Sequence, residues 1–443
     1  MGIILCIMRT RISLITVFIV LSLCHADKAE AQFWKHWFRR DEPVPKPAGH
    51  DKKRLDEGPP RRDEPPRYRR RQDFEYPYSE KKTRYRIDVL APLYLDELVK
   101  DNKPAYKGRI PEKASTGTEF CQGIQLAADT LNKLGFQVDV YIHDAASTQE
   151  APEALIRSRV LDKSDLIIGA IQSPQIPEVA QYAKKHQVNF ISAASPSDAG
   201  VTGNPYFTIM QPTLQTHCAA IMKRLQKQYK NTTIAVYRRS YVPLDESAFN
   251  FLMDIDEGRS NRVVKVLCNK IPVKETLAQV FSPDNVNVVV MAVMDVAYAE
   301  QLLAQLHDDF PGYKFEVYGM PSWRSMGELR KPDAFPNSVI HLTAPAYFDL
   351  TTQQGRYLSD VCYKAYGSKP GETVCRGYET LFWYAYLLRK YGTIFNPDIS
   401  DNGIVPFTRY DIKHQWDTNG EILYNENEHV YWYRYQDASY MVE

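Results

Sequence analysis

The chain has few cysteines, and none of them is spaced as in a metal site. Its seven cysteines form no CxxC pair and no Cys/His cluster with ligand spacing, so metal binding has no support in the sequence. Cys6 and Cys24 lie near the N-terminus, and the odd number that remains cannot all pair within one chain. Cys362 and Cys375 are the best candidates for a disulfide, and independent buried thiols are an equal alternative.

Motifs of common catalytic sites are also missing. The sequence contains no GxSxG elbow, no HExxH zinc motif, no GxxxxGK[ST] phosphate loop and no Rossmann GxGxxG. Its ten histidines are scattered along the chain. We therefore expect a protein that is not an enzyme and has no cofactor.

An excess of charge of one sign is the third absence. The formal net charge is +1 over 443 residues, so there is no electrostatic case for a nucleic-acid partner. The composition is 44% apolar and 25% charged, which is typical of a soluble globular protein long enough for two or three domains.

Long apolar runs are limited to the N-terminus. Arg9 and Arg11 precede a run of about a dozen uncharged residues at 12–23, which predicts a signal peptide rather than a membrane span. A small-x-small site at 29–31 predicts a signal peptide of residues 1–31, and a sequence resembling a lipobox before Cys24 leaves lipid anchoring open. Both alternatives place the product in the periplasm or cell envelope.

Residues 32–83 differ from the rest of the chain. This stretch is rich in proline and in charge of both signs and is almost free of aliphatic residues, so we expect a disordered spacer. Its basic run at 67–71 permits contact with an anionic membrane or wall polymer as a second interpretation.

From residue 84 onward, apolar strands alternate with amphipathic helices. This pattern predicts an α/β fold with parallel sheets covered by helices on both faces. The strands are too many for one sheet, so two lobes of similar design are expected. Strands are predicted at 86–93, 136–142, 165–171, 188–194, 206–210, 233–237, 263–267, 286–293, 315–318 and 338–345, and helices at 116–134, 153–161, 174–186, 214–229, 247–256, 297–306, 352–366 and 377–391. Residues 405–442 read as further strands, with an Asn-Gly turn at 419–420 between two of them.

The stretch 116–145 organises the rest. Phe120, Ile124, Ala128 and Leu131 recur at helical spacing. Apolar residues then alternate at period two over 136–142, which predicts a strand near a sheet edge with one wetter face.

Several segments in order resemble type I periplasmic solute-binding proteins of the branched-chain amino-acid-binding group. They are TGTEFCQGIQLAADTLN, the strand ending in Asp144, LIIGAIQSPQIPEVAQYAKKHQVNFISAASPSDA and NPYFTIMQPT. The resemblance implies two α/β lobes that close around an amino acid or amide, with lobe 1 at about 84–212 plus 346–400 and lobe 2 at about 213–345 plus parts of the C-terminal strands. The segment RRSYVPLD at 238–245 departs from the family pattern because it lacks a glycine after the tyrosine.

The candidate ligand-binding residues follow the predicted strands, because ligands of open parallel sheets bind outside the carboxyl ends of strands. Ser173 is expected to begin a helix whose amino end binds a carboxylate, or only to cap that helix. Asp295 is expected to bind an ammonium group, or only to cap the helix after it, and Trp323 to cover the ligand or to pack the hinge. The full set is Tyr94, Gln172, Ser173, Ala194, Ser195, Tyr241, Asp295 and Trp323.

These observations lead to two functional hypotheses. The first is an exported protein that captures an amino-acid-like small molecule between its lobes, for a membrane permease of an ABC transporter or for a sensor. The second is a cell-envelope scaffold or activator of wall synthesis, in which the same fold binds an envelope protein and large side chains such as Trp323 and Tyr241 fill the cleft. The two differ in whether the cleft is open.

Overall fold

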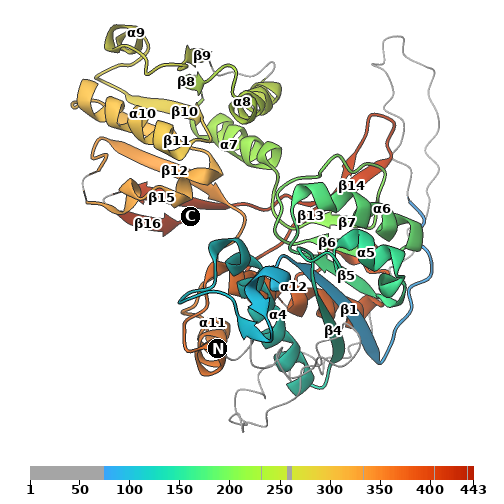
Figure 1. The fold of residues 1–443 in the computed structure, drawn as a ribbon. Coiled ribbons are helices and arrows are strands. Elements are labelled where there is room, and N and C mark those ends of the chain that lie inside the picture. The colour runs from blue at the N-terminus through green and yellow to red at the C-terminus, as the bar shows by residue number, and fades with distance from the viewer. Residues whose placement is uncertain (1–73, 231, 257–261, 333, 404, 437) are drawn as a thin grey trace, which may run out of the picture.

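The chain folds into two lobes, each built on one seven-stranded sheet (Figure 1). The computed structural model describes residues 74–230, 232–256, 262–332, 334–403, 405–436 and 438–443. The predictions for the signal peptide, for Cys24 and for the spacer up to residue 73 lie outside these residues. Among the residues described, every helix is too short or too polar to cross a bilayer.

The lobe 1 sheet has the strand order β13-β14-β7-β6-β5-β1-β4, and all neighbours except β13 and β14 run parallel. The predicted edge strand, β4, is confirmed at the edge of the sheet. Its strands are β1 (Arg84–Ala91), β4 (Gln137–Asp144), β5 (Leu166–Gly169), β6 (Asn189–Ser192), β7 (Phe207–Ile209), β13 (Ile412–Trp416) and β14 (Ile422–Asn427).

Helices cover both faces of this sheet. Alternate side chains of β1 point to opposite faces of the sheet. Ile87 and Val89 pack with α4, α11 and α12 in one core cluster, whereas Leu90 packs with α5 and α6 in another. The helices of lobe 1 are α3 (Leu95–Leu98), α4 (Glu112–Lys133), α5 (Pro152–Arg157), α6 (Ile176–His186), α11 (Gln353–Tyr366) and α12 (Glu372–Tyr391). A two-residue hairpin, β2 (Val99–Lys100) with β3 (Lys103–Pro104), follows α3.

Helices α4 and α12 touch through glycine. A Cβ atom added at Gly123 would overlap the carbonyl oxygen of Val374, and one added at Gly377 would overlap that of Phe120. The two backbones therefore lie closer than any side chain permits, which fixes α12 against α4 in the core of lobe 1.

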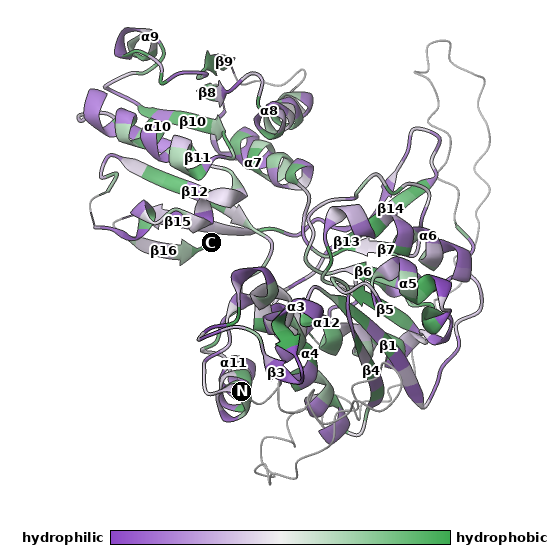
Figure 2. Cartoon of the chain, viewed as in Figure 1, coloured by the Kyte–Doolittle hydropathy of each residue, from purple (hydrophilic) through white to green (hydrophobic). Residues whose placement is uncertain are grey.

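The lobe 2 sheet has the order β16-β15-β12-β11-β10-β8-β9, with β15 and β16 antiparallel to their neighbours. Its strands are β8 (Thr233–Arg238), β9 (Arg262–Leu267), β10 (Val286–Ala292), β11 (Lys314–Tyr318), β12 (Ser338–Ala344), β15 (Tyr431–Gln436) and β16 (Ser439–Val442), and its helices are α7 (Leu214–Gln228), α8 (Pro243–Asp256), α9 (Lys274–Ala278) and α10 (Val296–Asp309). Hydrophobic residues follow the central strands of both sheets (Figure 2).

The chain crosses between the lobes three times, after β7, after β12 and after β14. Each crossing leaves from the carboxyl end of a strand that runs with the parallel strands of its sheet. The carboxyl ends of both sheets therefore face the junction of the lobes, where ligands of open parallel sheets bind.

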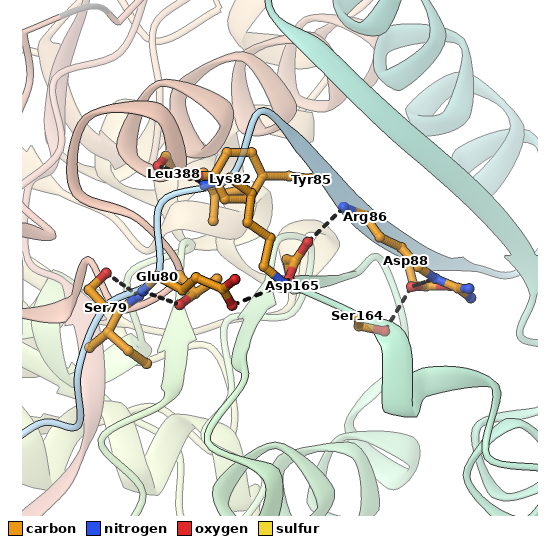
Figure 3. A network of polar contacts seen from close by, with 11 residues as sticks. Ser79, Glu80, Lys82, Tyr85, Arg86, Asp88, Ser164, Asp165 and Leu388 are labelled. Atoms are coloured by element: carbon orange, nitrogen blue, oxygen red, sulfur yellow. Dashed lines mark hydrogen bonds and ion pairs between the residues drawn. The ribbon is translucent and has the colours of Figure 1, made fainter.

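The residues before β1 are fastened to the opposite end of lobe 1 (Figure 3). Ser79 Oγ donates to the carbonyl of Tyr391 at 2.6 Å, and Lys82 Nζ lies 2.8 Å from Asp165 Oδ1, just before β5. In the same network Arg86 and Ser164 donate to the buried carboxylate of Asp88. Although burial alone raises it, hydrogen bonds from His143, Arg86 and Ser164 hold the pKa of Asp88 below its ordinary value.

All five cysteines in the described part of the chain are buried free thiols. The disulfide predicted between Cys362 and Cys375 is therefore wrong, and the alternative of independent thiols is confirmed. Both lie in the core cluster of lobe 1, and burial raises the pKa of each thiol, to about 12 for Cys375. Nearness in the sequence did not predict a disulfide correctly here, because each of the two cysteines packs in the core as part of its own helix.

Candidate functional site

Two serine hydroxyls meet at the carboxyl edge of the lobe 1 sheet. Ser173 follows β5 and Ser195 follows β6, and their Oγ atoms are 3.3 Å apart. Ser195 is buried, whereas Ser173 is half-buried. The adjacent Ala194 is half-buried and Gln172 is exposed. Hydroxyls both donate and accept, so this pair suits a polar ligand group.

Ser173 does not cap a helix. The segment Ser173–Gln175 is a short 3-10 turn that begins after Gln172, and α6 starts only at Ile176. Neither start has a side-chain cap, so the prediction that Ser173 is an N-cap is wrong. Pro174 and Pro177 both suit the first turn of a helix, and the α-helix begins at Ile176, one residue before the second of them.

Tyr94 follows β1 in a left-handed conformation, with φ 56° and ψ 37°. The carboxylate of Asp144, at the end of β4, fixes this turn by accepting the N–H groups of Leu93 (2.9 Å), Tyr94 (3.1 Å) and Leu95 (2.7 Å). Asp144 is 1% exposed, so these are charge-assisted bonds out of contact with water. The ring of Tyr94 is half-buried, with Lys113 Nζ 4.8 Å from its centre.

Asp144 is a positioning residue that sequence reasoning did not find. Its place at the end of a predicted strand was visible, but its partners lie about fifty residues earlier in the chain, and only the pairing of β1 with β4 brings them together. An acidic residue at the end of an edge strand is the one signal that the sequence contained.

Lobe 2 repeats this arrangement after its own first strand. Tyr241 follows β8 with φ 68°, and its N–H donates to Glu246 Oε1 at 3.0 Å. The preceding residue, Ser240, donates its N–H to Asn269 Oδ1 at 2.6 Å. Tyr241 is 90% exposed, so its ring stands free on the carboxyl edge of lobe 2. A left-handed tyrosine is strained, and strained residues cluster at functional sites.

Asp295 caps a helix, as one of its two interpretations predicted. Its Oδ1 accepts the N–H of Tyr298 at 3.0 Å, at the start of α10. The other oxygen lies 3.9 Å from Arg239, which is already paired with the buried Asp245 at 2.6 Å. The Asp295 side chain is 51% exposed and keeps one face toward solvent.

Trp323 is a core residue of lobe 2. Its side chain has no exposed surface, and its Nε1 donates to the carbonyl of Val293 at 2.7 Å. Gly319 makes room for the ring, because a Cβ atom there would overlap it. Trp323 therefore packs in the core of lobe 2, beneath the carboxyl end of β10, and does not cover a ligand site on the surface.

The candidates thus form two groups, one on each lobe. Within the described residues, no hydrogen bond or ion pair joins the group of lobe 1 to that of lobe 2. The lobes are linked instead at the junction, where Arg324 Nη2 of lobe 2 lies 2.7 Å from Glu372 Oε1 of lobe 1.

A buried carboxylate also links the lobes. Glu426 of β14 is 3% exposed and accepts the N–H of Thr213 (2.9 Å) and the hydroxyl of Thr216 (2.5 Å) at the start of α7. Burial raises the pKa of Glu426. Nearby, His217 Nδ1 lies 2.8 Å from Thr343 Oγ1, and burial together with Arg324 lowers the pKa of His217 to about 3.

No group of three or more potential ligand side chains that could hold a metal ion occurs in the described ranges. One cavity of about 480 Å³ lies at the amino ends of β8 and β10, far from the carboxyl edge of lobe 2. None of the candidate residues lines it. Its lining comprises Tyr229, Thr232, Thr233, Ala235, Val280, Phe281, Ser282 and residues 285–288.

Comparison with known proteins agrees with this architecture. A family model described as periplasmic binding protein matches residues 112–267. No curated protein matches the chain by sequence.

Three solved structures illustrate the likeness of fold. An ABC-type branched-chain amino acid transporter protein from Rhodopseudomonas palustris is 12% identical with a TM-score of 0.55, covering 81% of this chain and 95% of that chain. A branched-chain amino acid ABC transporter periplasmic ligand-binding protein from Burkholderia xenovorans is 15% identical with a TM-score of 0.54, covering 81% and 94%. An ABC transporter substrate-binding protein from Desulfitobacterium hafniense, in complex with Leu, is 14% identical with a TM-score of 0.52, covering 81% and 100%. The resemblance to type I periplasmic solute-binding proteins and the two-lobed α/β fold are thereby confirmed.

Proposed function

We propose that this chain is an exported, non-enzymatic receptor that captures an amino-acid-like small molecule between its two lobes. The observation that carries the proposal is the contact between Ser173 and Ser195, whose hydroxyls are 3.3 Å apart at the carboxyl edge of lobe 1. Sequence reasoning selected these serines separately, and they converge on one point of the edge where such folds bind ligands.

The flanking tyrosines support the same role. Tyr94 and Tyr241 occupy matching places after the first strand of each lobe, both in the left-handed conformation and each with its N–H bound by a carboxylate. Closure of the lobes about their three crossings brings the two rings toward a ligand held by the serines. Asp295, which keeps a half-exposed carboxylate on the edge of lobe 2, is the proposed partner of a ligand ammonium group.

The scaffold hypothesis predicted a cleft filled by Trp323 and Tyr241. Trp323 lies instead in the core of lobe 2, and Tyr241 is 90% exposed. Neither side chain fills the junction, and this favours capture of a solute over protein binding alone.

Delivery of the solute is proposed from the solved structures. The names of the Rhodopseudomonas, Burkholderia and Desulfitobacterium proteins place them in ABC transporters, and the last was solved with Leu. A membrane permease is accordingly the proposed partner, a small aliphatic amino acid the first ligand to test, and the periplasm or cell envelope the proposed location.

The test is a thermal-shift screen of the full chain against amino acids and amides, followed by calorimetric titration of each hit. A ligand at 100 times its Kd stabilises the folded state by about 2.7 kcal/mol. Ser173→Ala removes one hydroxyl that faces a ligand carboxylate, so the affinity should fall about tenfold or more.

Ser359→Ala is the matched control. Its hydroxyl donates only to the carbonyl of Gly355 within α11, at 2.8 Å, so the same substitution there should leave the affinity unchanged. Equal affinities of the Ser173→Ala variant and the wild type for every hit would contradict the proposed site. If none of the amino acids and amides binds, the result would favour the scaffold hypothesis.

A further inference from the structure

Three charged residues lie along one face of α12 near its amino end. Glu372, Arg376 and Glu379 are spaced four and then three residues apart, so they are neighbours on the helix surface. This end of α12 faces lobe 2, because Arg324 of lobe 2 reaches Glu372.

Both carboxylates that flank Arg376 are engaged elsewhere. Glu372 Oε1 accepts from Arg324 Nη2 at 2.7 Å. Glu379, which has no exposed surface, accepts the N–H groups of Phe407 (2.8 Å) and Thr408 (2.5 Å) and the hydroxyl of Tyr410 (2.9 Å).

Arg376 is left without a counterion in the described part of the chain. Its Nε is buried with no hydrogen-bond partner there, and no ion pair of its guanidinium occurs among the same residues. A buried polar group without a partner is costly, and a charged one more so, so an orphan of this kind calls for an explanation. The residue as a whole is half-buried, so part of its surface is within reach of solvent.

Burial dominates the electrostatics of Arg376. Burial and the positive charge of Arg324 lower its pKa, whereas Tyr410, Glu372 and Glu379 raise it, and the net shift is downward. The guanidinium nevertheless stays charged, because arginine does not deprotonate in proteins. The amino end of α12 adds to this field, since its N-cap, Gly371, provides no side-chain acceptor for the free N–H groups of the first turn.

We propose that Arg376 of lobe 1 and Arg324 of lobe 2 together bind the carboxylate group of a small molecule at the junction of the lobes. A guanidinium matches a planar carboxylate through two parallel N–H···O bonds. The bound anion supplies the missing partner of Arg376 and connects the lobes. This site shares no residue with the serine pair, so it does not rest on the proposed function.

The experiment is calorimetric titration of the full chain with sodium succinate, at an ionic strength held constant with sodium chloride. Wild-type protein should give saturable binding. Arg376→Met and Arg324→Met should each weaken the Kd about tenfold or more, since each removes charged hydrogen bonds. Arg389→Met, at the other end of α12, is the matched control and should leave the Kd unchanged, and so should Ser173→Ala.

Absence of saturable binding by the wild type would overturn the proposal, as would an unchanged Kd in Arg376→Met. Equally tight binding of inorganic phosphate would overturn the assignment to carboxylates. A large loss in Ser173→Ala would place succinate at the serine pair instead. If Arg376→Met does not fold, Arg324→Met decides the matter, because Arg324 lies in a short 3-10 turn of lobe 2 and leaves α12 intact.

Discussion

The turn that presents Tyr94 should depend on one carboxylate, and Asp144→Asn tests this dependence. Oδ1 of Asp144 accepts the N–H groups of Leu93, Tyr94 and Ala146, and Oδ2 accepts that of Leu95 at 2.7 Å. An asparagine whose oxygen takes the place of Oδ1 keeps three of these bonds. Its NH₂ group then faces the N–H of Leu95, and the fourth bond is lost because both groups are donors.

The expected cost follows from these bonds. Loss of one hydrogen bond to a charged group costs about 1.5–3 kcal/mol, and loss of the charge weakens the other three, so we expect about 2–4 kcal/mol in total. The turn also holds Tyr94 in the left-handed region, which by itself costs roughly 1–2 kcal/mol per residue, so this part of the backbone should open first.

The assay is hydrogen exchange of the amides of residues 93–95, together with urea unfolding of the full chain. Asp139→Asn is the matched control: it is the same substitution in the same strand, but its carboxylate is 38% exposed and pairs with Arg84 at the surface, which is worth about 0–1 kcal/mol. If the two variants lose the same stability and these amides exchange no faster in Asp144→Asn, the account of Asp144 as the residue that fixes this turn is refuted.

Three further predictions concern the cores. Burial raises the pKa of Glu379 from 4.5 to about 7, so the unfolded chain releases this proton at a lower pH than the folded chain does. The free energy of unfolding should therefore fall by roughly 2–4 kcal/mol as the pH rises between these two values. Urea unfolding at a series of pH values should show this fall in the wild type and not in Glu379→Gln. Gly123→Ala should lower the unfolding free energy by about 1–3 kcal/mol or more, because the added methyl overlaps the backbone of α12, whereas Gly312→Ala, which meets no atom, should change it by less than about 1 kcal/mol; a similar midpoint for both would contradict the close contact of α4 with α12. Burial raises the pKa of Cys121, Cys218, Cys268 and Cys375 to about 12, so native protein at neutral pH should resist alkylation at these sites, as read by mass spectrometry, and rapid labelling would show that the cores open readily.

Periodicity in the sequence predicted most of the fold, because helices and strands leave a local pattern. The alternation over 136–142 correctly identified β4 as an edge strand, since only an edge strand keeps a wetter face in a covered parallel sheet. The Asn-Gly turn at 419–420 does connect β13 to β14, with Gly420 at φ 83°. Short elements were missed, among them α9 and the β2–β3 hairpin, because a few residues contain no measurable period.

The candidate site was harder to predict, because its geometry depends on contacts between residues that lie far apart in the sequence. The end of each strand could be located, and with it Ser173, Ser195, Tyr94 and Tyr241. That the two serines touch, that Trp323 points into the core and that Asp144 binds the turn of Tyr94 depend on which strands are neighbours. The C-terminal strands show the same limit: β13 and β14 join lobe 1 while β15 and β16 join lobe 2, although all four look alike in sequence.

The attachment of residues 79–82 to the far end of lobe 1 has a mechanical consequence. The contacts of Ser79 and Lys82 lie at the amino ends of the strands, on the opposite side of the lobe from the three crossings. A pull on the N-terminal segment is therefore transmitted into the lobe 1 sheet along β1, without passing through the junction. In the closure proposed above, lobe 2 moves relative to lobe 1. Fixing the N-terminus to a surface would then hold lobe 1 without placing a load on the three crossings.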